Sequence, residues 1–516
     1  MLYLAFIWHM HQPYYKDLIT QEFCLPWVRL HGVKDYLDMV EVLKDFPAIK
    51  QTFNFVPSLI DQIQDYLKPD FKERYYELSV KKADDLSNEE KDFILNNFFM
   101  ADVERIISMQ PRFYELYLKR QSNISFSNQD LLDLVVWFNL AWIDPSFRKS
   151  LPELNSLVRK GRFFNEDDKK LVLSKQIDIL RDIIPTYKSF IDSGQIEVSI
   201  SPYYHPILPL LNHTKSALEA NIKTTMPKIF FNHPEDVQYH ISEAIKLYQQ
   251  FFGKSPRGMW PSEQAVCRHI LPLIAEAGIN WIVTDESILF KSLKKQRDMN
   301  LLYRPYSIET KCGHLNVIFR DNIISNKIGF VYHHWKTEDA VSDFMHHLEA
   351  VSEAFKDNPA LVAVALDGEN AWEYYPNDGW DFLKLLYKRI TEHPKIKTVT
   401  VSEYLDMHPD EPRLNKLAAG SWISADFSKW IGNYEKNIAW EYLAKAREEL
   451  ANSPSSPNIE MAWKQIYIAE GSDWFWWYGD DNAQDFDILF RRHLSNFYKL
   501  LNKPSPEYLN TPIKKP

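Results

Sequence analysis

Short apolar segments rich in β-forming residues alternate along this chain with longer helical patterns, and this alternation limits the possible folds more than any other feature. It predicts an α/β fold with a parallel sheet, because each helix returns the chain to the start of the next strand. Seven or eight such units imply a closed or nearly closed barrel. The strand candidates are Leu2–Trp8, Ile49–Phe55, Ile196–Ser201, Arg257–Ser262, Asn280–Asp285, Leu315–Arg320 and Leu361–Asp367, with Thr398–Val401 as a weaker eighth.

Two regions depart from the alternation. Between about residues 70 and 190 the strand signals vanish, and amphipathic stretches such as Leu131–Trp142 predict a helical insertion. After two prolines near residue 410 the pattern changes again and becomes helical from Trp430 onward. We therefore expect a barrel with its insertion in residues 1–405 and a C-terminal helical domain in residues 406–516.

Composition excludes several classes of partner. The 516 residues carry a formal net charge of -10, which gives no broad attraction to nucleic acid or to anionic membranes. The three cysteines are widely spaced and form no CxxC pair, so neither a disulfide framework nor a thiolate zinc site is expected. No basic region precedes the apolar Met1–Trp8 and no run of about 18 apolar residues occurs, so we expect a soluble, cytoplasmic protein.

Polar side chains follow nearly every predicted strand, which is where functional residues of parallel barrels collect. These residues are His9 and His11, Tyr203 and His205, Glu263, Asp285 and Glu286, Arg320 and Asp321, and Asp367 and Glu369. Carboxylates and histidines without a glycine-rich phosphate loop indicate acid/base chemistry on a neutral polar substrate. Glycoside hydrolysis fits best, because it needs two carboxyl groups that flank one bond. The 16 Trp and 27 Tyr agree with a sugar ligand, whose C–H faces stack on aromatic rings.

Five ordered motifs resemble those of glycoside hydrolase family 57 and cover most of the chain. They are His9–Pro13, Gly194–Val198 with Pro202–Pro209, Gly258–Glu263, Ala365–Asn370 and Gly471–Gly479. The resemblance implies a (β/α)7 TIM-like barrel followed by helices, a retaining mechanism, and α-glucans such as starch, glycogen or maltooligosaccharides as substrates. It assigns Glu263 as nucleophile and Asp367 as acid/base. The amylase and amylopullulanase branch is the most similar, although Asn326 stands where that branch has an aspartate.

The motifs and the strand ends also give the expected substrate contacts. They are His9, His11, Gln12, Tyr203, His205, Trp260, Arg320, Asp321, Glu369, Trp372, Trp422, Asp473 and Trp474. Among these, Trp260 and Trp372 are the expected stacking platforms, and Asp473 with Trp474 are the expected contacts from the C-terminal helices. The expected partner is an α-glucan, with no cofactor and no metal.

Several alternatives remain open at this stage. Asp285 and Glu286 also end a strand and are the rival acids. His9 and His11 alternate on one strand, so they are also a possible metal pair, with a third ligand from Asp321, His205 or Asp367. A metal there would indicate a metal-dependent sugar hydrolase or deacetylase. A 4-α-glucanotransferase or branching enzyme would use the same chemistry with a sugar hydroxyl as acceptor. A non-enzymatic alternative is a glucan-binding protein with an inactive barrel.

Overall fold

The computed structural model describes residues 1–514 except 357, 370, 455–456 and 480–483. Within this part of the chain nine strands form one sheet in the order β10-β1-β3-β5-β6-β7-β9-β8, and β11 also pairs with β1. All but β8 pair in parallel, and seven of these parallel strands coincide with the seven strand candidates. They are β1 Leu2–Met10, β3 Gln51–Phe55, β5 Ile196–Ile200, β6 Gly258–Met259, β7 Trp281–Asp285, β9 Gly313–Arg320 and β10 Ala360–Asp367.

Strand β10, the first of this order, lies beside β9, the last parallel strand, and this contact almost closes the barrel. After β9, the backbone N–H of Asp321 donates to the carbonyl of Ala363 on β10 at 2.8 Å. The weaker eighth candidate is only half right, because β11 is Ile396–Thr398 and Val401 already begins helix α20 (Val401–Met407). Sequence analysis did not predict strand β8 (Tyr306–Thr310), which forms an antiparallel hairpin with β9.

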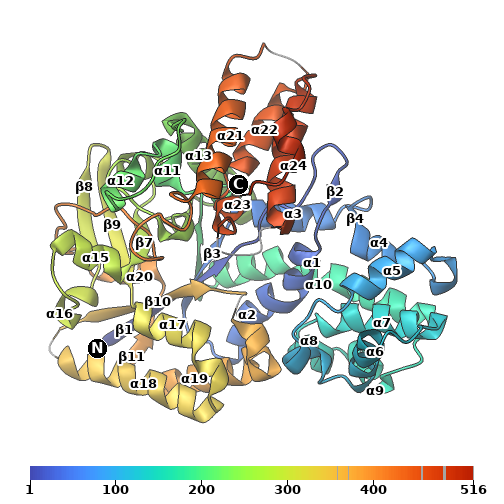
Figure 1. The fold of residues 1–516 in the computed structure, drawn as a ribbon. Helices are drawn as coiled ribbons and strands as arrows, with labels where there is room; N and C mark the ends of the chain where they lie inside the picture. The colour runs from blue at the N-terminus through green and yellow to red at the C-terminus, as the bar shows by residue number, and fades with distance from the viewer. Residues whose placement is uncertain (357, 370, 455–456, 480–483, 515–516) are drawn as a thin grey trace.

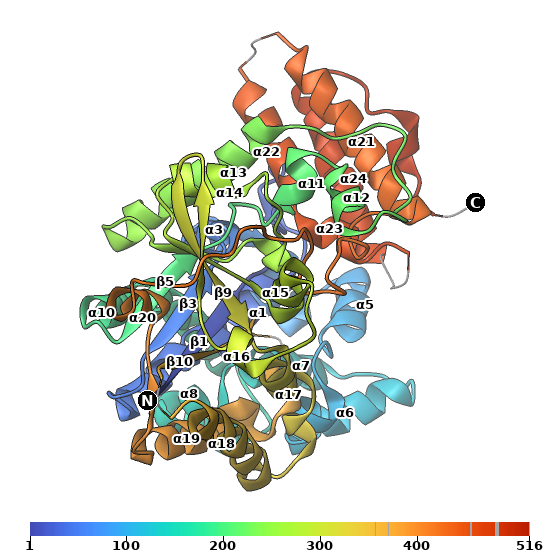
Figure 2. The same ribbon diagram turned by 90° about the vertical axis from the view of Figure 1, so that its left-hand side faces the viewer.

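Side chains of β1 alternate between two hydrophobic layers, as the period of a strand requires. Phe6 faces outward and packs against Phe344 and Tyr387 of the surrounding helices. Ala5 and Ile7 belong to a separate, smaller cluster with residues of β7, β9 and β10, which fills the barrel interior. The helices that pack on the strands include α10 Glu166–Asp192, α13 Pro234–Phe252, α14 Leu271–Glu276, α15 Glu286–Leu293, α17 Asn322–Phe330, α18 Thr337–Ala354 and α19 Trp380–Glu392 (Figures 1 and 2).

A group of helices between β4 (Lys72–Glu73) and β5 lies to one side of the barrel, on the right of Figure 1, and we call it the insertion. Its helices are α4 Arg74–Val80, α5 Asn88–Asn97, α6 Pro111–Gln121, α7 Asn128–Ala141, α8 Pro145–Ser150 and α9 Pro152–Lys160, followed by α10. Arg29 of helix α1 (Trp27–His31) is fully buried at its base. Its guanidinium donates to both oxygens of Glu73 at 2.7 and 2.9 Å, and also to Asn139 and Gln176.

The C-terminal helices lie above the barrel in Figure 1, over the end where the parallel strands finish. They are α21 Tyr434–Ala451, α22 Ile459–Ala469, α23 Ser472–Trp476 and α24 Gln484–Leu500. Arg447 of α21 forms a bidentate ion pair with Asp236 of α13 at 2.7 and 2.8 Å, and Tyr467 of α22 stacks on Tyr239 at 3.6 Å. In the described residues no helix combines the length and apolar character needed to cross a membrane.

Replacing Arg29 with alanine should destabilise the protein by about 3–5 kcal/mol, because Glu73 then stays buried without its counter-charge. Equilibrium urea unfolding followed by tryptophan fluorescence measures this loss. Arg181→Ala is the matched control, since Arg181 pairs with Asp178 on an exposed face of α10 and should cost about 0.5 kcal/mol or less. Equal losses in the two variants would contradict the role of the buried pair.

Candidate active site

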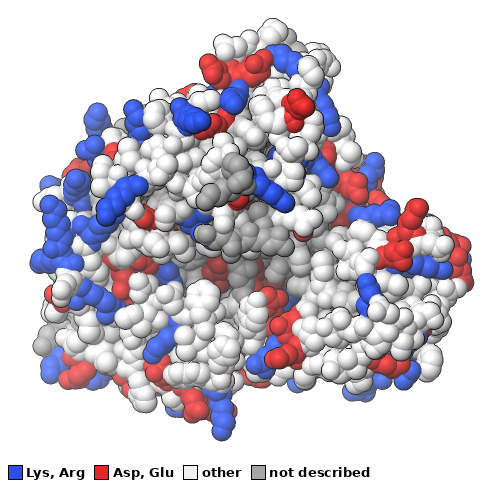
Figure 3. Space-filling model, viewed as in Figure 1, with Lys and Arg blue, Asp and Glu red and all other residues white. Residues whose placement is uncertain are grey.

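The polar strand ends meet at one mouth of the barrel, beneath the C-terminal helices. His9 of β1 lies directly opposite Asp367 of β10 in the parallel register, and the N–H of Gly368 donates to the His9 carbonyl at 2.7 Å. Figure 3 shows the surface hollowed between the barrel, the insertion and the C-terminal helices. Residues distant in sequence therefore converge on one enclosed site.

Glu263 follows β6 on a strained turn. Its φ is 55° and that of Gln264 is 50°, so two consecutive non-glycine residues adopt the left-handed conformation. The antiparallel bridge between Val266 and Gly420 brings a later segment against this turn. That segment carries Trp422, whose Nε1 donates to Glu263 Oε2 at 2.9 Å, and Ser472 Oγ lies 3.4 Å from Glu263 Oε1.

The carboxyl of Glu263 is electrostatically coupled to the other acids of the mouth. The pKa of Glu263 is raised to about 8, chiefly by burial and also by the negative charges of Asp367 and Asp473, although the donors Trp422 and Ser472 oppose the shift. Simultaneous ionisation of Glu263 and Asp367 is therefore unfavourable near neutral pH. The pair is suited to share one proton, which acid/base chemistry at two carboxyl groups requires.

Three histidines line the mouth beside these acids. His9 Nδ1 donates to Asn54 Oδ1 at 2.6 Å, and the His9 ring stacks on Trp260 at 4.7 Å. The rings of His11 and His205 lie 4.0 Å apart. Burial lowers the pKa of His9 to about 3 and that of His205 well below 6.5, so both imidazoles are neutral at physiological pH.

Two residues of α23 complete this histidine group. His11 Nε2 lies 2.8 Å from Asp473 Oδ1, and His205 Nδ1 lies 3.0 Å from Ser472 Oγ. The backbone N–H of Ser472 also donates to the His205 carbonyl at 2.9 Å. The site is thus shared between the barrel and the C-terminal helices.

A buried histidine of α13 holds those two segments together. His240 Nδ1 accepts from the backbone N–H of Tyr204 at 3.3 Å, and its Nε2 lies 2.8 Å from Glu470 Oε2. Both His240 and Glu470 have fully buried side chains. Because Tyr204 precedes His205 and Glu470 lies three residues before Asp473, this contact sets the positions of two site residues. Sequence analysis missed His240, since nothing in a helix of mixed polarity marks it.

Glu369 and Gln12 lie behind the histidines in a buried polar layer. Glu369 Oε1 accepts from the backbone N–H of His11 at 3.1 Å, and burial with the charge of Asp367 raises its pKa well above the usual range. Gln12 accepts from the hydroxyl of Tyr15 at 3.2 Å. Asn370, the next residue of the motif, lies outside the described residues.

Three of the expected sugar contacts are buried tryptophans. Trp260, Trp372 and Trp474 are 0%, 1% and 1% exposed, so none of them offers an open ring face. Trp260 is covered by His9, while Trp372 and Trp474 donate to the carbonyls of Gly368 and Ile468. Their rings are packed inside the protein, so contact of these tryptophans with sugar stays a prediction that the burial does not favour. Trp422 is partly exposed and lies against Glu263 and Arg320, so it is the ring available to a ligand.

Asp321 was expected among the substrate contacts, but its side chain has other partners in the structure. It is fully buried, caps the first turn of α17, and accepts from Tyr303 at 2.8 Å beside His347 at 2.9 Å. Its carboxyl therefore belongs to a structural network. Tyr203 has its charged neighbours on α3 (Pro57–Tyr66) and α13, so the structure does not bring its side chain to the group around Glu263.

The neighbouring acids and Arg320 have assigned partners too. Asp285 caps α15 and lies 3.5 Å from Arg320, while Glu286 accepts from Arg297 at 2.8 Å. Arg320 lies over the Trp422 ring at 5.2 Å and donates to Asn326 at 2.8 Å. An amide oxygen at position 326 thus still fixes the guanidinium. The rival acids Asp285 and Glu286 stabilise helix starts and ion pairs.

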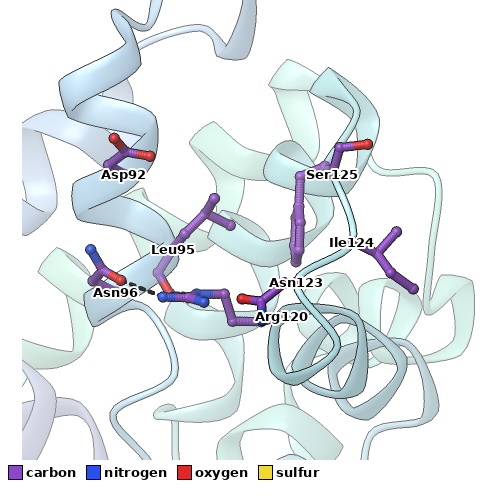
Figure 4. A pocket seen from close by; sticks show the side chains of 8 residues that line it. Asp92, Leu95, Asn96, Arg120, Asn123, Ile124 and Ser125 are labelled. Atoms are coloured by element: carbon purple, nitrogen blue, oxygen red, sulfur yellow. Dashed lines mark hydrogen bonds between the residues drawn. The ribbon is translucent and has the colours of Figure 1, made fainter.

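The structure also contains a pocket of about 360 Å³ away from the mouth, on the insertion (Figure 4). It lies between α5 and the loop after α6, and none of the expected site residues lines it. Its lining residues are Asp92, Leu95, Asn96, Arg120, Asn123, Ile124, Ser125 and Phe126.

Comparison with known proteins agrees with the resemblance seen in the motifs. A model of glycosyl hydrolase family 57 matches residues 5–415. The 4-alpha-glucanotransferase of Thermococcus litoralis is 26% identical over 278 residues, which are 52% of this chain and 36% of that protein. Alpha-amylase 1 of Dictyoglomus thermophilum is 22% identical over 299 residues, 56% of this chain and 36% of that protein. The chain therefore aligns with about a third of the length of these relatives.

Solved structures confirm the predicted fold class. An alpha-amylase from Thermotoga maritima superposes with a TM-score of 0.60 at 15% identity, covering 97% of this chain and 93% of that one. A GH57 branching enzyme from Thermococcus kodakaraensis superposes with a TM-score of 0.60 at 17% identity, covering 96% and 90%. At such identities the similarity concerns the fold alone.

Replacing Glu263 with glutamine should stabilise the protein, and the gain should depend on pH. Because the folded state holds the Glu263 proton up to about pH 8, wild-type stability falls as pH rises from the unfolded value of 4.5 towards 8. The variant should melt at nearly the wild-type temperature at pH 4 and about 2–5 °C higher at pH 8.5. Differential scanning calorimetry measures both.

Glu89→Gln, which alters an exposed carboxyl at the start of α5, is the control and should give no such trend. A melting difference for Glu263→Gln that is the same at pH 4 and pH 8.5 would contradict a raised pKa of Glu263.

Proposed function

The chain belongs to glycosyl hydrolase family 57, and from this premise we propose that it is a retaining glycosidase acting on α-linked glucans. The observation that carries the proposal is the coupling of two carboxyls at one buried mouth: the charge of Asp367 raises the pKa of Glu263. Retaining glycosidases need such a pair, one member ionised and the other protonated. The relatives named alpha-amylase and 4-alpha-glucanotransferase support α-glucans as the substrate class.

In the first step Glu263 attacks the anomeric carbon, and the bond from that carbon to the glycosidic oxygen breaks as Asp367 protonates the oxygen. Trp422 supports this role because it holds Oε2 at 2.9 Å and leaves Oε1, with the longer 3.4 Å contact to Ser472, as the attacking atom. The reactive form needs Glu263 ionised and Asp367 protonated, and the two donors to Glu263 favour its carboxylate against the effect of burial.

In the second step Asp367 takes a proton from the acceptor hydroxyl, whose oxygen then bonds to the anomeric carbon and releases Glu263. Water as acceptor gives hydrolysis, and a sugar hydroxyl gives transfer. Neutral imidazoles at His9 and His205 and the open ring of Trp422 suit a sugar in the mouth, because hydroxyls need hydrogen-bond partners and C–H faces need an apolar surface.

Variants of the two carboxyls should fail in different ways. Glu263→Gln should lower turnover of maltoheptaose by ~10⁴-fold or more, because no covalent intermediate forms. Asp367→Asn should lose maltoheptaose turnover but still react with α-maltotriosyl fluoride, whose leaving group needs no proton. Added azide should then yield α-maltotriosyl azide, since azide needs no general base. Chromatography and anomeric NMR identify the products, including longer oligosaccharides if transfer occurs.

Asp285→Asn is the matched control, because this buried strand-end acid caps α15 and should keep most of the activity. Formation of the β-azide, or full activity of Glu263→Gln, would rule out the proposed mechanism.

Substitution of His240 should lower turnover although His240 itself makes no contact with the proposed substrate. His240→Ala removes the link between Tyr204 and Glu470, so His205 and Asp473 lose their fixed separation. We expect a fall in kcat of about 10–100-fold, by analogy with the cost of losing groups that orient a ligand-binding histidine. His240→Gln, which keeps a donor for Glu470, should recover part of the loss. Steady-state kinetics on maltoheptaose separate kcat from KM, and unchanged kcat in both variants would contradict the positioning role.

A further inference from the structure

Two histidines and one carboxylate converge at the mouth with the spacing of metal ligands. One donor atom from each of His11, His205 and Asp473 lies within 4.8 Å of the others. The three residues come from the loop after β1, the loop after β5 and helix α23. A nitrogen, nitrogen and oxygen set of this kind suits zinc and similar borderline divalent cations, and three protein ligands leave coordination positions open.

Ring nitrogens in this group are enclosed without a hydrogen-bond partner. Among the described residues, His11 Nδ1 and His205 Nε2 are buried and make no hydrogen bond. A buried polar atom left without a partner costs about 1–3 kcal/mol, so such atoms mark a place that a ligand fills. The opposite nitrogens are already fixed, by Asp473 Oδ1 at 2.8 Å and Ser472 Oγ at 3.0 Å. The contact with Ser472 orients the His205 imidazole towards a metal, whereas a cation bound by both His11 and Asp473 replaces the hydrogen bond between those two side chains.

The other ligands considered from the sequence do not belong to this set. His9 has its Nδ1 engaged by Asn54 at 2.6 Å and its ring face covered by Trp260. Asp321 is occupied by Tyr303 and His347 in a separate network. The pair suggested by the alternation of His9 and His11 is therefore replaced by a set assembled from three distant segments.

We propose that His11, His205 and Asp473 bind a zinc-class divalent cation in competition with the glucan. The competition follows from geometry and rests on the proposed function. A cation held by these residues occupies the atoms that would accept sugar hydroxyls. It also lies beside the nucleophile, because Ser472 Oγ is 3.0 Å from His205 and 3.4 Å from Glu263. The bound ion is thus an inhibitor of this enzyme and has no role as a cofactor.

The test is calorimetric titration of the EDTA-treated full chain with zinc chloride, together with visible d–d absorption of the cobalt form. We expect one zinc per chain, with affinity reduced at least 10-fold in His205→Gln and in Asp473→Asn. His333→Gln is the control, because His333 and His334 form a separate pair with rings 3.9 Å apart and belong to no ligand set. Thermal unfolding of each variant without metal verifies that it is folded.

A second titration in the presence of maltoheptaose measures the competition, and we expect the apparent zinc affinity to fall as the sugar concentration rises. Zinc binding that is lost in His333→Gln and kept in His205→Gln would overturn the proposal, as would the absence of binding or an affinity that maltoheptaose leaves unchanged. If the wild type turns over no α-glucan, the proposed function fails, while the zinc titration of the variants still reads out the metal site.

Discussion

The site depends on one contact between the barrel and the C-terminal helices. The segment around His205 lies beside the segment that precedes Asp473. The two are joined by the bridge between Pro206 and Gly471 and by the hydrogen bond from the Ser472 N–H to the His205 carbonyl. Without the C-terminal segments, Glu263 would lose both of its side-chain donors, Trp422 and Ser472. The barrel alone therefore supplies the acids but does not enclose them. The chemistry requires enclosure, because a shifted pKa and an ordered sugar both depend on exclusion of water.

Enclosure has an energetic consequence for Glu263. Removal from water destabilises the carboxylate of Glu263 relative to its protonated form. The two donors, Trp422 and Ser472, offset only part of this desolvation cost. The backbone adds to it, since Glu263 and Gln264 both hold positive φ values that the surrounding packing must enforce. Strain and desolvation at the same residue mark the place where stability is exchanged for reactivity.

Sequence patterns were sufficient for the barrel strands and for the acids at their ends. Seven apolar runs coincide with seven parallel strands, because a strand buried on both faces reads as a continuous apolar segment. They were insufficient for side-chain exposure. Trp260, Trp372 and Trp474 stand next to polar residues in the sequence, yet tertiary packing buries all three, whereas Trp422 remains open. Contacts such as Asn54, His240 and Ser472 were missed for the same reason, since their partners lie far away in the chain.

The histidine group links sugar recognition to metal binding by a shared requirement. A neutral imidazole that accepts a hydrogen bond from a hydroxyl presents the same lone pair that a cation binds, so a mouth that holds several such groups near a carboxylate attracts both ligands. Asn54 binds Nδ1 of His9 and Trp260 covers its ring face, whereas His11 Nδ1 and His205 Nε2 have no hydrogen-bond partner among the described residues. The imidazoles that keep such a nitrogen can therefore serve either ligand, which is why we expect the cation and the sugar to compete for the mouth.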